Sequence, residues 1–323
     1  MISYAAARAA QALAVLVIIA FIGFLLVSGL GDPLASLLPA DASPADRAAM
    51  ARALHLDEPA VTRFLSYCAS VLRGDFGISY RAHEPVGRLI WERLPATVEL
   101  ALTSLALTLA VGVPAGVYCG IRPEGGLSRA IMLVSIAGVT LPTFVVGTLL
   151  IAVFSVKLGW LPSFGRGTTV GLGVWTTGLL TASGWRALVL PALTLSLFQI
   201  TFVIRLIRTQ LMEVGQSEYI RFARACGVRP RLIWFVHALK NTLLPVLTIL
   251  ALQFGNIIAF SVVTENVFAW PGLGALFLQS VQTADMPVIS AYLILIGAMF
   301  MAVNLAVELT YPLIDPRVLR ARA

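Results

Sequence analysis

Six apolar runs in this sequence are each long enough to cross a lipid bilayer, and they constrain the fold more than any other feature. A helix needs roughly 20 apolar residues to span the hydrocarbon. The runs cover residues 9–30, 97–121, 131–157, 187–210, 242–264 and 288–312. Because lipid offers no hydrogen-bond partners to the backbone, such runs must form helices. The sequence therefore predicts an all-α, polytopic membrane helix bundle with about six transmembrane helices.

Composition and charge support a membrane protein and argue against other classes. Apolar residues make up 59% of the 323 positions and charged residues 12%, an excess that a soluble core does not need. The net charge of +7 does not indicate nucleic acid, because the basic residues flank the apolar runs, where they orient a membrane protein. Cys68, Cys119 and Cys226 have no CxxC spacing and the three histidines are scattered. No metal site is therefore predicted.

The distribution of Lys and Arg predicts how the bundle is oriented. Basic residues are concentrated from Arg205 to Lys240, between the fourth and fifth runs, and again at Arg317, Arg320 and Arg322 after the sixth run. The loop 265–287, on the opposite side, has none. Loops rich in Lys and Arg stay in the cytoplasm, so both termini are predicted to be cytoplasmic.

This orientation divides the chain into three parts: a first transmembrane helix (1–30), an extracytoplasmic helical loop (31–96) and a core with five transmembrane helices (97–323). In the extracytoplasmic loop, Ser43 is a predicted N-cap for a helix that runs through Leu54, and a second helix starts near Glu58. The loop 265–287 is rich in Gly and Pro near Trp270 and is predicted to form a tight re-entrant turn or gate.

Residues 216–241 are both basic and amphipathic. One predicted apolar stripe has the spacing i, i+3, i+4 and i+7 and consists of Tyr219, Phe222, Ala223 and Cys226. Gly227 can end a helix in the left-handed conformation, and Pro230 suits the first turn of the next helix. Two short helices are thus predicted to meet at a glycine bend. They either present side chains to a cytosolic partner or only cap the bundle.

The segment EYIRFARACG, followed by HALKNTLLPVLT, resembles the cytoplasmic coupling loop of ABC importer permeases of the dipeptide/oligopeptide/nickel branch. RGDFGISYR, LPTFVVGTLL, LGWLPSFG, ENVFAWPGLGALF and YPLIDPRV resemble further segments of that family in the same order, so the resemblance covers essentially the whole chain. It implies ATPase-coupling roles for Glu218, Arg221, Ala223, Arg224 and Gly227. The maltose-type loop has a glutamate six residues before the glycine; here that position is Arg221, so Glu218 does not inherit its role.

The resemblance implies a permease subunit of the bacterial inner membrane that imports di- or oligopeptides. Nickel, glutathione or another small solute is the alternative substrate. The implied partners are a second homologous permease, two cytosolic ATP-binding subunits and an extracytoplasmic solute-binding protein. Neither lysine, Lys157 or Lys240, follows a phosphate-binding glycine loop. The chain is therefore not expected to be an enzyme or to bind a cofactor, and ATP is expected to be used by the partner subunits.

Polar residues within the apolar runs are candidates for lining the solute pathway. Such residues tend to face a bundle interior, and here they are Gln199, Thr201, Gln253 and Asn256. Hydrogen bonding between helices is the alternative role. Pro191 and the polar positions after it predict that the fourth span is broken.

Two other protein classes are weighed against the importer. An ion-coupled secondary transporter requires ionisable residues in its spans, and the main candidate, Glu308, lies near the cytoplasmic end, where pairing with a basic neighbour is the simpler role. The GxGD sequence at 29–32 is typical of intramembrane aspartyl proteases. That chemistry needs a second carboxylate close to the first, and no other Asp lies in a predicted span.

Overall fold

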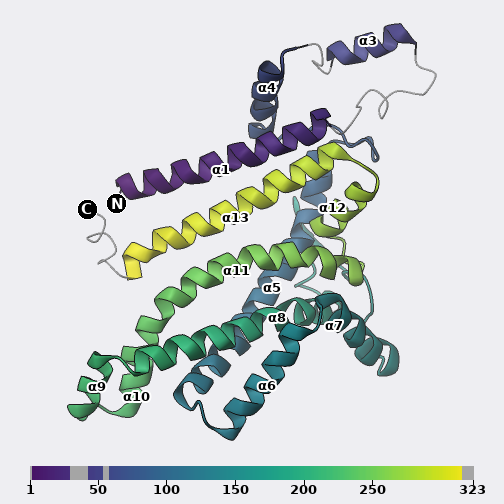
Figure 1. Cartoon of the computed structure of the whole chain (residues 1–323). Coiled ribbons are helices and arrows are strands. Elements are labelled where there is room, and N and C mark those ends of the chain that lie inside the picture. The colour runs from purple at the N-terminus through teal and green to yellow at the C-terminus, as the bar shows by residue number, and fades with distance from the viewer. Residues whose placement is uncertain (1, 30–42, 54–57, 315–323) are drawn as a thin grey trace. The chain divides into compact units, whose positions relative to one another are not determined.

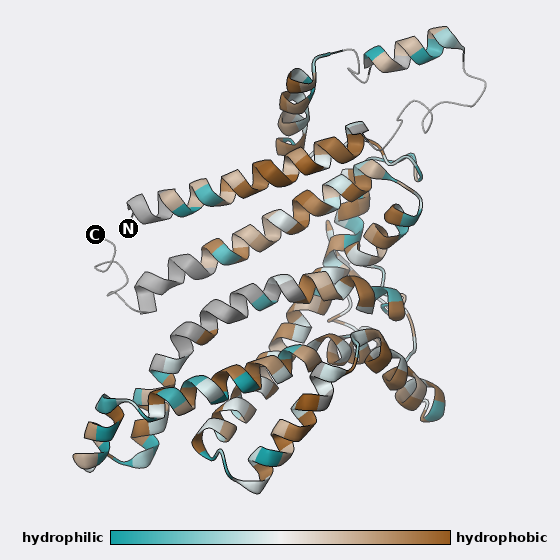
Figure 2. Ribbon diagram, viewed as in Figure 1, coloured by the Kyte–Doolittle hydropathy of each residue, from teal (hydrophilic) through white to brown (hydrophobic). Residues whose placement is uncertain are grey.

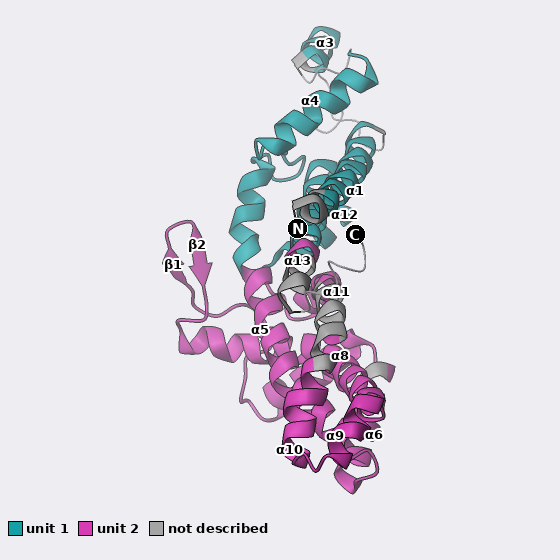
Figure 3. Ribbon diagram, turned by 90° about the vertical axis from the view of Figure 1, so that its left-hand side faces the viewer, with its two compact units in different colours: residues 1–95, 272–302 teal, residues 96–271, 303–323 magenta. Residues whose placement is uncertain are grey.

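The computed structural model of the chain describes residues 2–29, 43–53 and 58–314. Within these ranges the regular structure is almost entirely helical, and strands occur only in one short hairpin (Figure 1). The chain forms two compact units, shown in Figure 3: unit 1 comprises residues 1–95 and 272–302, and unit 2 comprises residues 96–271 and 303–323. The predicted all-α helix bundle is confirmed, and each unit is described by itself below.

Unit 1 contains α1 (Ile2–Gly29), α3 (Pro44–Ala53), α4 (Ala60–Leu72), the first turns of α5 (Val86–Ile121), α12 (Leu273–Gln282) and most of α13 (Met286–Ile314). The two helices predicted in the loop 31–96 correspond to α3 and α4. The Ser43 hydroxyl accepts a 3.2 Å bond from the Asp46 N–H, as an N-cap does. Leu54, the predicted last residue of the first helix, lies outside the described residues.

Aromatic packing joins α4 to α1. The Phe64 ring meets Phe21 and Phe24 edge-on, with centroid distances of 5.4 and 5.5 Å. Such edge-to-face pairs stabilise beyond the area that they bury. On the same helix, the Tyr67 hydroxyl hydrogen-bonds to Ser290 of α13. Helix α4 is therefore held through Phe64 and Tyr67, whereas its other large apolar residues, Val61, Leu65 and Leu72, are exposed.

The segment that carries RGDFGISYR is held by a single carboxylate. Asp285, buried between α12 and α13, accepts hydrogen bonds from the Ser79 hydroxyl and from the backbone N–H groups of Tyr80, at 3.1 Å, and Arg81, at 3.3 Å. The Ser79 hydroxyl also accepts from the Ala82 N–H at 2.9 Å. A carboxylate that accepts several N–H and O–H bonds satisfies its charge without a cation. The Asp285 carboxylate therefore fixes the conformation of the loop at residues 79–82.

Unit 2 contains the remainder of α5 and the elements α6 (Gly126–Thr140), α7 (Thr143–Leu150), the π-helical η1 (Ile151–Lys157), β1 (Val170–Leu172), β2 (Trp175–Thr177), α8 (Ala182–Gly215), α9 (Glu218–Ala225), α10 (Pro230–Leu232), the π-helical η2 (Ile233–Ala238) and α11 (Leu239–Val267). The strands pair antiparallel, with Val170 opposite Thr177. Helix α8 packs against α6, α7 and α11 and forms the centre of the unit.

Small residues let α5 and α8 approach closely. A Cβ added at Gly116 would lie 2.9 Å from the Ile207 Cβ, and one added at Gly120 would lie 2.9 Å from the Leu211 Cβ. Membrane helices lack a hydrophobic force between them and associate through such close packing. The contact continues toward the C-terminal end of α8 in a buried cluster with Val117, Val203 and Ile220.

Two predicted spans differ in the structure. The third apolar run is not one helix, because α6 ends before Pro142 and α7 begins a new direction after it (Figure 1); the residue before a proline disfavours the α conformation. The fourth run, predicted to be broken, is one helix of 34 residues with Pro191 inside it. That proline removes one backbone N–H, and the helix persists because Leu188, Pro191 and Leu195 are all buried.

The other runs are confirmed as helices, with shifted ends. Four described helical segments are each long and apolar enough to cross a membrane: Ala7–Ser28, Val86–Ile121, Ala182–Gly215 and Met286–Ala306. The fifth run lies within α11, whose 29 residues extend beyond it at both ends. The loop 265–287 contains the helix α12 (Leu273–Gln282), so the predicted tight turn is limited to residues 268–272.

Candidate functional site

The first candidate site is the pair of short helices between α8 and α11. Helix α9 ends at Ala225, and Gly227 takes φ 74°, the left-handed conformation. The Val228 N–H bonds to the Ala223 carbonyl at 3.1 Å and the Gly227 N–H to the Arg224 carbonyl at 3.0 Å. These two bonds form a Schellman motif, which satisfies the last carbonyls of the helix. Pro230 opens the next helix, so the predicted glycine bend is confirmed.

A tryptophan joins this loop to α8. The Trp234 ring lies so close to Gly215, the last residue of α8, that a Cβ there would be 2.9 Å from the ring. On α9, the Arg224 guanidinium lies 5.5 Å from the ring centroid, a cation–π contact. The indole therefore touches residues of α8 and α9 while belonging to η2. The Trp234 ring therefore links α9 to the end of α8.

The buried face of α9 is not the predicted apolar stripe. Ile220 is fully buried against α8, whereas Phe222 is 71% exposed, and Tyr219 and Cys226 are exposed as well. Three of the four stripe residues therefore face outward, whereas Ala223 packs partly against the cluster that also holds Ile220, Ile207 and Leu211. Three further apolar side chains are exposed on α10 and η2: Leu232, Phe235 and Val236. The loop thus presents apolar side chains away from the bundle.

The charged residues of the loop lie at its surface. Glu218 stands in the first turn of α9 and contacts Arg221 at 3.2 Å, with both side chains mostly exposed. Exposed pairs of this kind contribute little to stability. Arg224 is also exposed apart from its contact with Trp234. Of the five residues predicted to couple to an ATPase, Gly227 and Ala223 shape the loop, and Glu218, Arg221 and Arg224 are accessible.

The predicted pathway residues are buried within unit 2. Gln199 on α8 is 1% exposed, and its side-chain oxygen has no hydrogen-bond partner among the described residues. Thr201 and Gln253 are also buried. A Cβ added at Gly138 would lie 2.8 Å from the Thr201 hydroxyl, so Thr201 packs against α6. The side chain of Asn256, like that of Glu308, lies outside the described residues.

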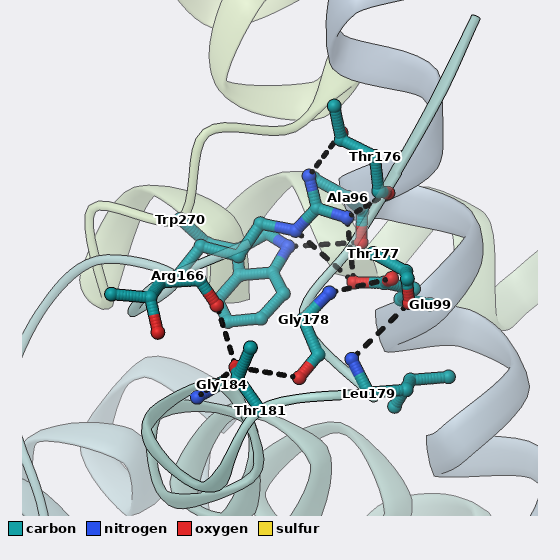
Figure 4. A network of polar contacts seen from close by, with 11 residues as sticks. Ala96, Glu99, Arg166, Thr176, Thr177, Gly178, Leu179, Thr181, Gly184 and Trp270 are labelled. Atoms are coloured by element: carbon teal, nitrogen blue, oxygen red, sulfur yellow. Dashed lines mark hydrogen bonds and ion pairs between the residues drawn. The ribbon is translucent and has the colours of Figure 1, made fainter. Parts of the chain in front are cut away.

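A second polar site lies at the other end of α8, about 51 Å away for a helix of 34 residues. Figure 4 shows Glu99 of α5 facing Arg166 of the segment 158–181. The Arg166 Nη2 donates to Glu99 Oε2 at 2.7 Å and to the Thr176 carbonyl at 2.7 Å. The Gly178 N–H donates to Glu99 Oε1 at 3.0 Å. The ion pair is buried and hydrogen-bonded, the geometry that such a pair needs to be stable.

The start of α5 also holds the end of α11. The Trp270 indole N–H donates to the Ala96 carbonyl at 2.9 Å, and the Thr97 hydroxyl donates to Glu265 at 2.7 Å (Figure 4 shows the tryptophan). Glu265 and Trp270 are buried. The first turns of α5 in unit 2 therefore fasten both the segment 158–181 and the end of α11 at this end of the unit.

Sequence reasoning missed this second site. Glu99 lies inside the predicted span 97–121, and an ionisable residue within a span is a signal of function or of pairing. The residue predicted by this rule was Glu308 instead. The sequence could flag Glu99 by that rule, but not its partner, because Arg166 is 67 residues away in a loop without regular structure.

Comparison with known proteins identifies the family of this chain. Residues 1–101 match the N-terminal region of binding-protein-dependent transport system membrane components, and residues 112–320 match the family "Binding-protein-dependent transport system inner membrane component". A structural relative, the methionine ABC transporter MetNI in inward-facing conformations, superposes with a TM-score of 0.55 at 18% identity over 73% of this chain and 96% of that chain. That likeness concerns the fold.

Similar proteins of known sequence agree with this family over nearly their whole length. A putative peptide transport system permease protein of Brucella abortus (strain 2308) is 37% identical over 313 residues, which are 96% of this chain and 97% of that protein. A dipeptide transport system permease protein of Alkalihalophilus pseudofirmus is 32% identical over 331 residues (98% and 99%), and a glutathione transport system permease protein of Escherichia coli (strain K12) is 34% identical over 319 residues (98% and 99%). The chain therefore belongs to the inner-membrane permeases of binding-protein-dependent ABC importers.

Proposed function

We propose that this permease carries di- or oligopeptides and is driven by cytosolic ATP-binding subunits that dock on the exposed face of α9, α10 and η2. The observation that carries the proposal is the outward direction of Phe222 on a helix whose opposite side is buried. Apolar side chains exposed in a cluster mark a protein interface. The chain itself binds no cofactor, and its partner subunits hydrolyse ATP.

The route of coupling follows the contacts of the loop. Docking subunits push on α9, whose Schellman motif at Gly227 keeps it rigid relative to η2. The Trp234 ring passes the movement to Gly215 at the end of α8. Because α8 packs against most of unit 2, its displacement rearranges the bundle as a whole. Alternating access results when closure of the ATPase pair opens the bundle to the outside, and hydrolysis resets it.

The rest of the transporter follows from the family. A second homologous permease completes the pathway, two ATP-binding subunits bind in the cytoplasm, and an extracytoplasmic binding protein delivers the solute. Both termini of this chain are cytoplasmic in this arrangement, because the basic segment 205–240 adjoins the docking face. The peptide substrate rests on relatives whose names specify peptides, a dipeptide and glutathione.

The pathway itself is proposed to involve the buried amides of α8 and α11. An amide oxygen without a partner, such as that of Gln199, costs free energy when buried, and water or solute would satisfy it when the bundle opens. Gln253, Thr201 and Asn256 are placed along the same pathway. Replacing Gln253 with Ala is expected to change transport and to leave stimulation of the ATPase unchanged. Loss of assembly in this variant would instead assign Gln253 to packing.

The docking proposal is tested by co-purification from solubilised membranes, with an ATPase assay on the purified complex. Phe222→Ala is expected to release the ATP-binding subunits without lowering the thermal stability of the permease, because its side chain is exposed. Gly227→Pro is expected to uncouple the ATPase, since proline cannot adopt φ 74° and lacks the N–H that bonds to Arg224. A matched control is Leu133→Ala, an exposed apolar residue of α6 outside the loop.

The outcomes separate the importer from other transporters. An ATPase that remains bound and stimulated in Phe222→Ala contradicts docking at this face. A permease that purifies alone and moves solute along an ion gradient after reconstitution contradicts the coupling mechanism. Uptake of a labelled dipeptide by vesicles with the full complex tests the substrate, with nickel and glutathione as the competing solutes.

A further inference from the structure

An apolar arm protrudes from unit 2 near the segment 158–181. It consists of α7 and η1, which together cover residues 143–157. Figure 2 colours this arm mainly as hydrophobic. A helical arm of these 15 residues measures about 22 Å, less than the roughly 30 Å of a bilayer core. The arm therefore does not cross a membrane by itself, although its side chains are almost all apolar.

A tryptophan stands just beyond the tip of the arm. After Lys157 the chain turns through Gly159, which has φ 64°, and the Trp160 N–H bonds back to the Phe154 carbonyl at 2.9 Å. The Trp160 ring rests beside Phe154 with a centroid distance of 5.9 Å. The side chain is nevertheless 60% exposed. The backbone of Trp160 is thus held by a hydrogen bond, while most of its indole ring is exposed.

A second exposed tryptophan lies at the start of α8. Trp185 lies in the first turn of α8, which is a membrane span, and is 49% exposed. Its indole N–H donates to the Leu179 carbonyl at 2.7 Å. The next residue, Arg186, donates from Nη2 to the Trp160 carbonyl at 2.7 Å. This bond ties the tip of the arm to the end of the span.

We propose that Trp160 and Trp185 form a lipid anchor that contacts the boundary between acyl chains and headgroups. Tryptophan is enriched at this boundary because its ring is apolar and its N–H is polar. The position at the end of the α8 span makes the patch continuous with the membrane surface of the bundle. Exposed Val156 and Leu180 extend the apolar contact, while the exposed Lys157 and Arg186 suit the phosphate layer.

The anchor has a consequence for the neighbouring ion pair. The segment 158–181 that follows the arm also carries Arg166, which is bound to Glu99 of α5. Lipid contact at Trp160 and Trp185 therefore fixes the depth of this segment relative to the bilayer, and the ion pair fixes it relative to α5. The segment is held from two sides while the opposite end of α8 is moved by its coupling partners.

The anchor is tested by fluorescence quenching of the full chain in lipid nanodiscs. Variants that retain one tryptophan each, Trp160, Trp185 or Trp270, and carry Phe at the other tryptophan positions are reconstituted in phosphatidylcholine. Bromine near the headgroup end of the acyl chains is expected to reduce the emission of Trp160 and Trp185 strongly. Trp270 is the matched control, because it is 1% exposed within the same unit, and its emission should stay unchanged.

Three results would overturn the anchor. Quenching of Trp160 and Trp185 no greater than that of Trp270 would exclude lipid contact. Strong quenching by aqueous iodide that bromolipid does not match would place the patch in water, and shielding by added solute-binding protein would make it a protein docking surface. If the single-tryptophan chains do not fold, the native chain is compared with a Trp160→Phe/Trp185→Phe double variant, both in a Trp91→Phe background because Trp91 is also 60% exposed. The double variant should show much less bromolipid quenching, and equal quenching would overturn the anchor.

Discussion

Glu99 and Arg166 are 67 residues apart in the sequence, yet their side chains meet at 2.7 Å in a site that buries both. The pair fastens the connecting segment 158–181 to α5, a helix long and apolar enough to cross a membrane. Thr176 and Gly178 provide further hydrogen bonds, so both charges are satisfied from the same segment. The stability of the folded segment 158–181 therefore depends on the Glu99 carboxylate.

Removing the charge of Glu99 tests this dependence. Glu99→Gln retains an acceptor for the Gly178 N–H but leaves the Arg166 guanidinium buried without its counter-charge. Such a loss typically costs about 3–5 kcal/mol, so a clear fall in the thermal unfolding midpoint of the purified permease is expected. The control is Glu92→Gln, whose carboxylate contacts Arg88 at 3.0 Å on the surface, and no measurable change is expected there. Equal midpoints in the two variants would contradict a structural role for the buried pair.

The sequence was sufficient for the helices and insufficient for their contacts. Apolar length located the helices of five of the six runs, and Gly227 and Pro230 predicted the bend between α9 and α10, because backbone conformation depends on nearby residues. The break before Pro142 and the continuity of α8 through Pro191 were not predicted. One proline lies between helices and the other inside packed layers, and only tertiary contacts distinguish them. The same limit explains why Ile220 rather than Phe222 is buried, and why Arg166 was not recognised.

Asp285 is expected to hold the loop at residues 79–82 of unit 1 in its folded conformation. Asp285→Ala removes the acceptor of the Ser79 hydroxyl and of the Tyr80 and Arg81 N–H groups. Ser79 is buried, and a buried donor left without its partner typically costs about 1–3 kcal/mol, so the loop should open and trypsin should cleave after Arg81 much faster. Asp75→Ala is the control, because the Asp75 carboxylate accepts one exposed bond from Gly77. Unchanged cleavage in Asp285→Ala would show that the loop is held by other contacts.

Gly215 is expected to be essential for coupling through Trp234. In Gly215→Ala the new Cβ would lie 2.9 Å from the ring, so the ring must move away from α8. We expect ATP-binding subunits to remain bound but their hydrolysis to become independent of the solute-binding protein. Gly126→Ala is the control, since a Cβ there meets nothing within 4 Å. Normal stimulation in Gly215→Ala would contradict a route through this contact.

Cysteine labelling tests the orientation of the chain. Cys226 is exposed at the end of α9, Cys68 is half-buried on α4, and Cys119 is buried. With both termini in the cytoplasm, an impermeant maleimide should label Cys68 from outside intact cells and Cys226 only in inside-out vesicles, while Cys119 stays unlabelled. Labelling of Cys68 and Cys226 from the same side would contradict the orientation.

The pH dependence of this labelling follows from the surroundings of Cys68. Burial raises the pKa of the Cys68 thiol above its ordinary value. Since the thiolate is the reactive form, a raised pKa lowers the reactive fraction near neutral pH, and the labelling rate should keep rising as the pH is increased through the alkaline range. The labelling rate of Cys68 is measured on intact cells at several pH values by stopping the reaction after increasing times. Unfolded chain provides the control, because its exposed thiol should reach half of its maximal rate at a lower pH, near the ordinary value of about 8.5. Identical pH profiles for the folded and unfolded chains would show that α4 does not shield Cys68 from water.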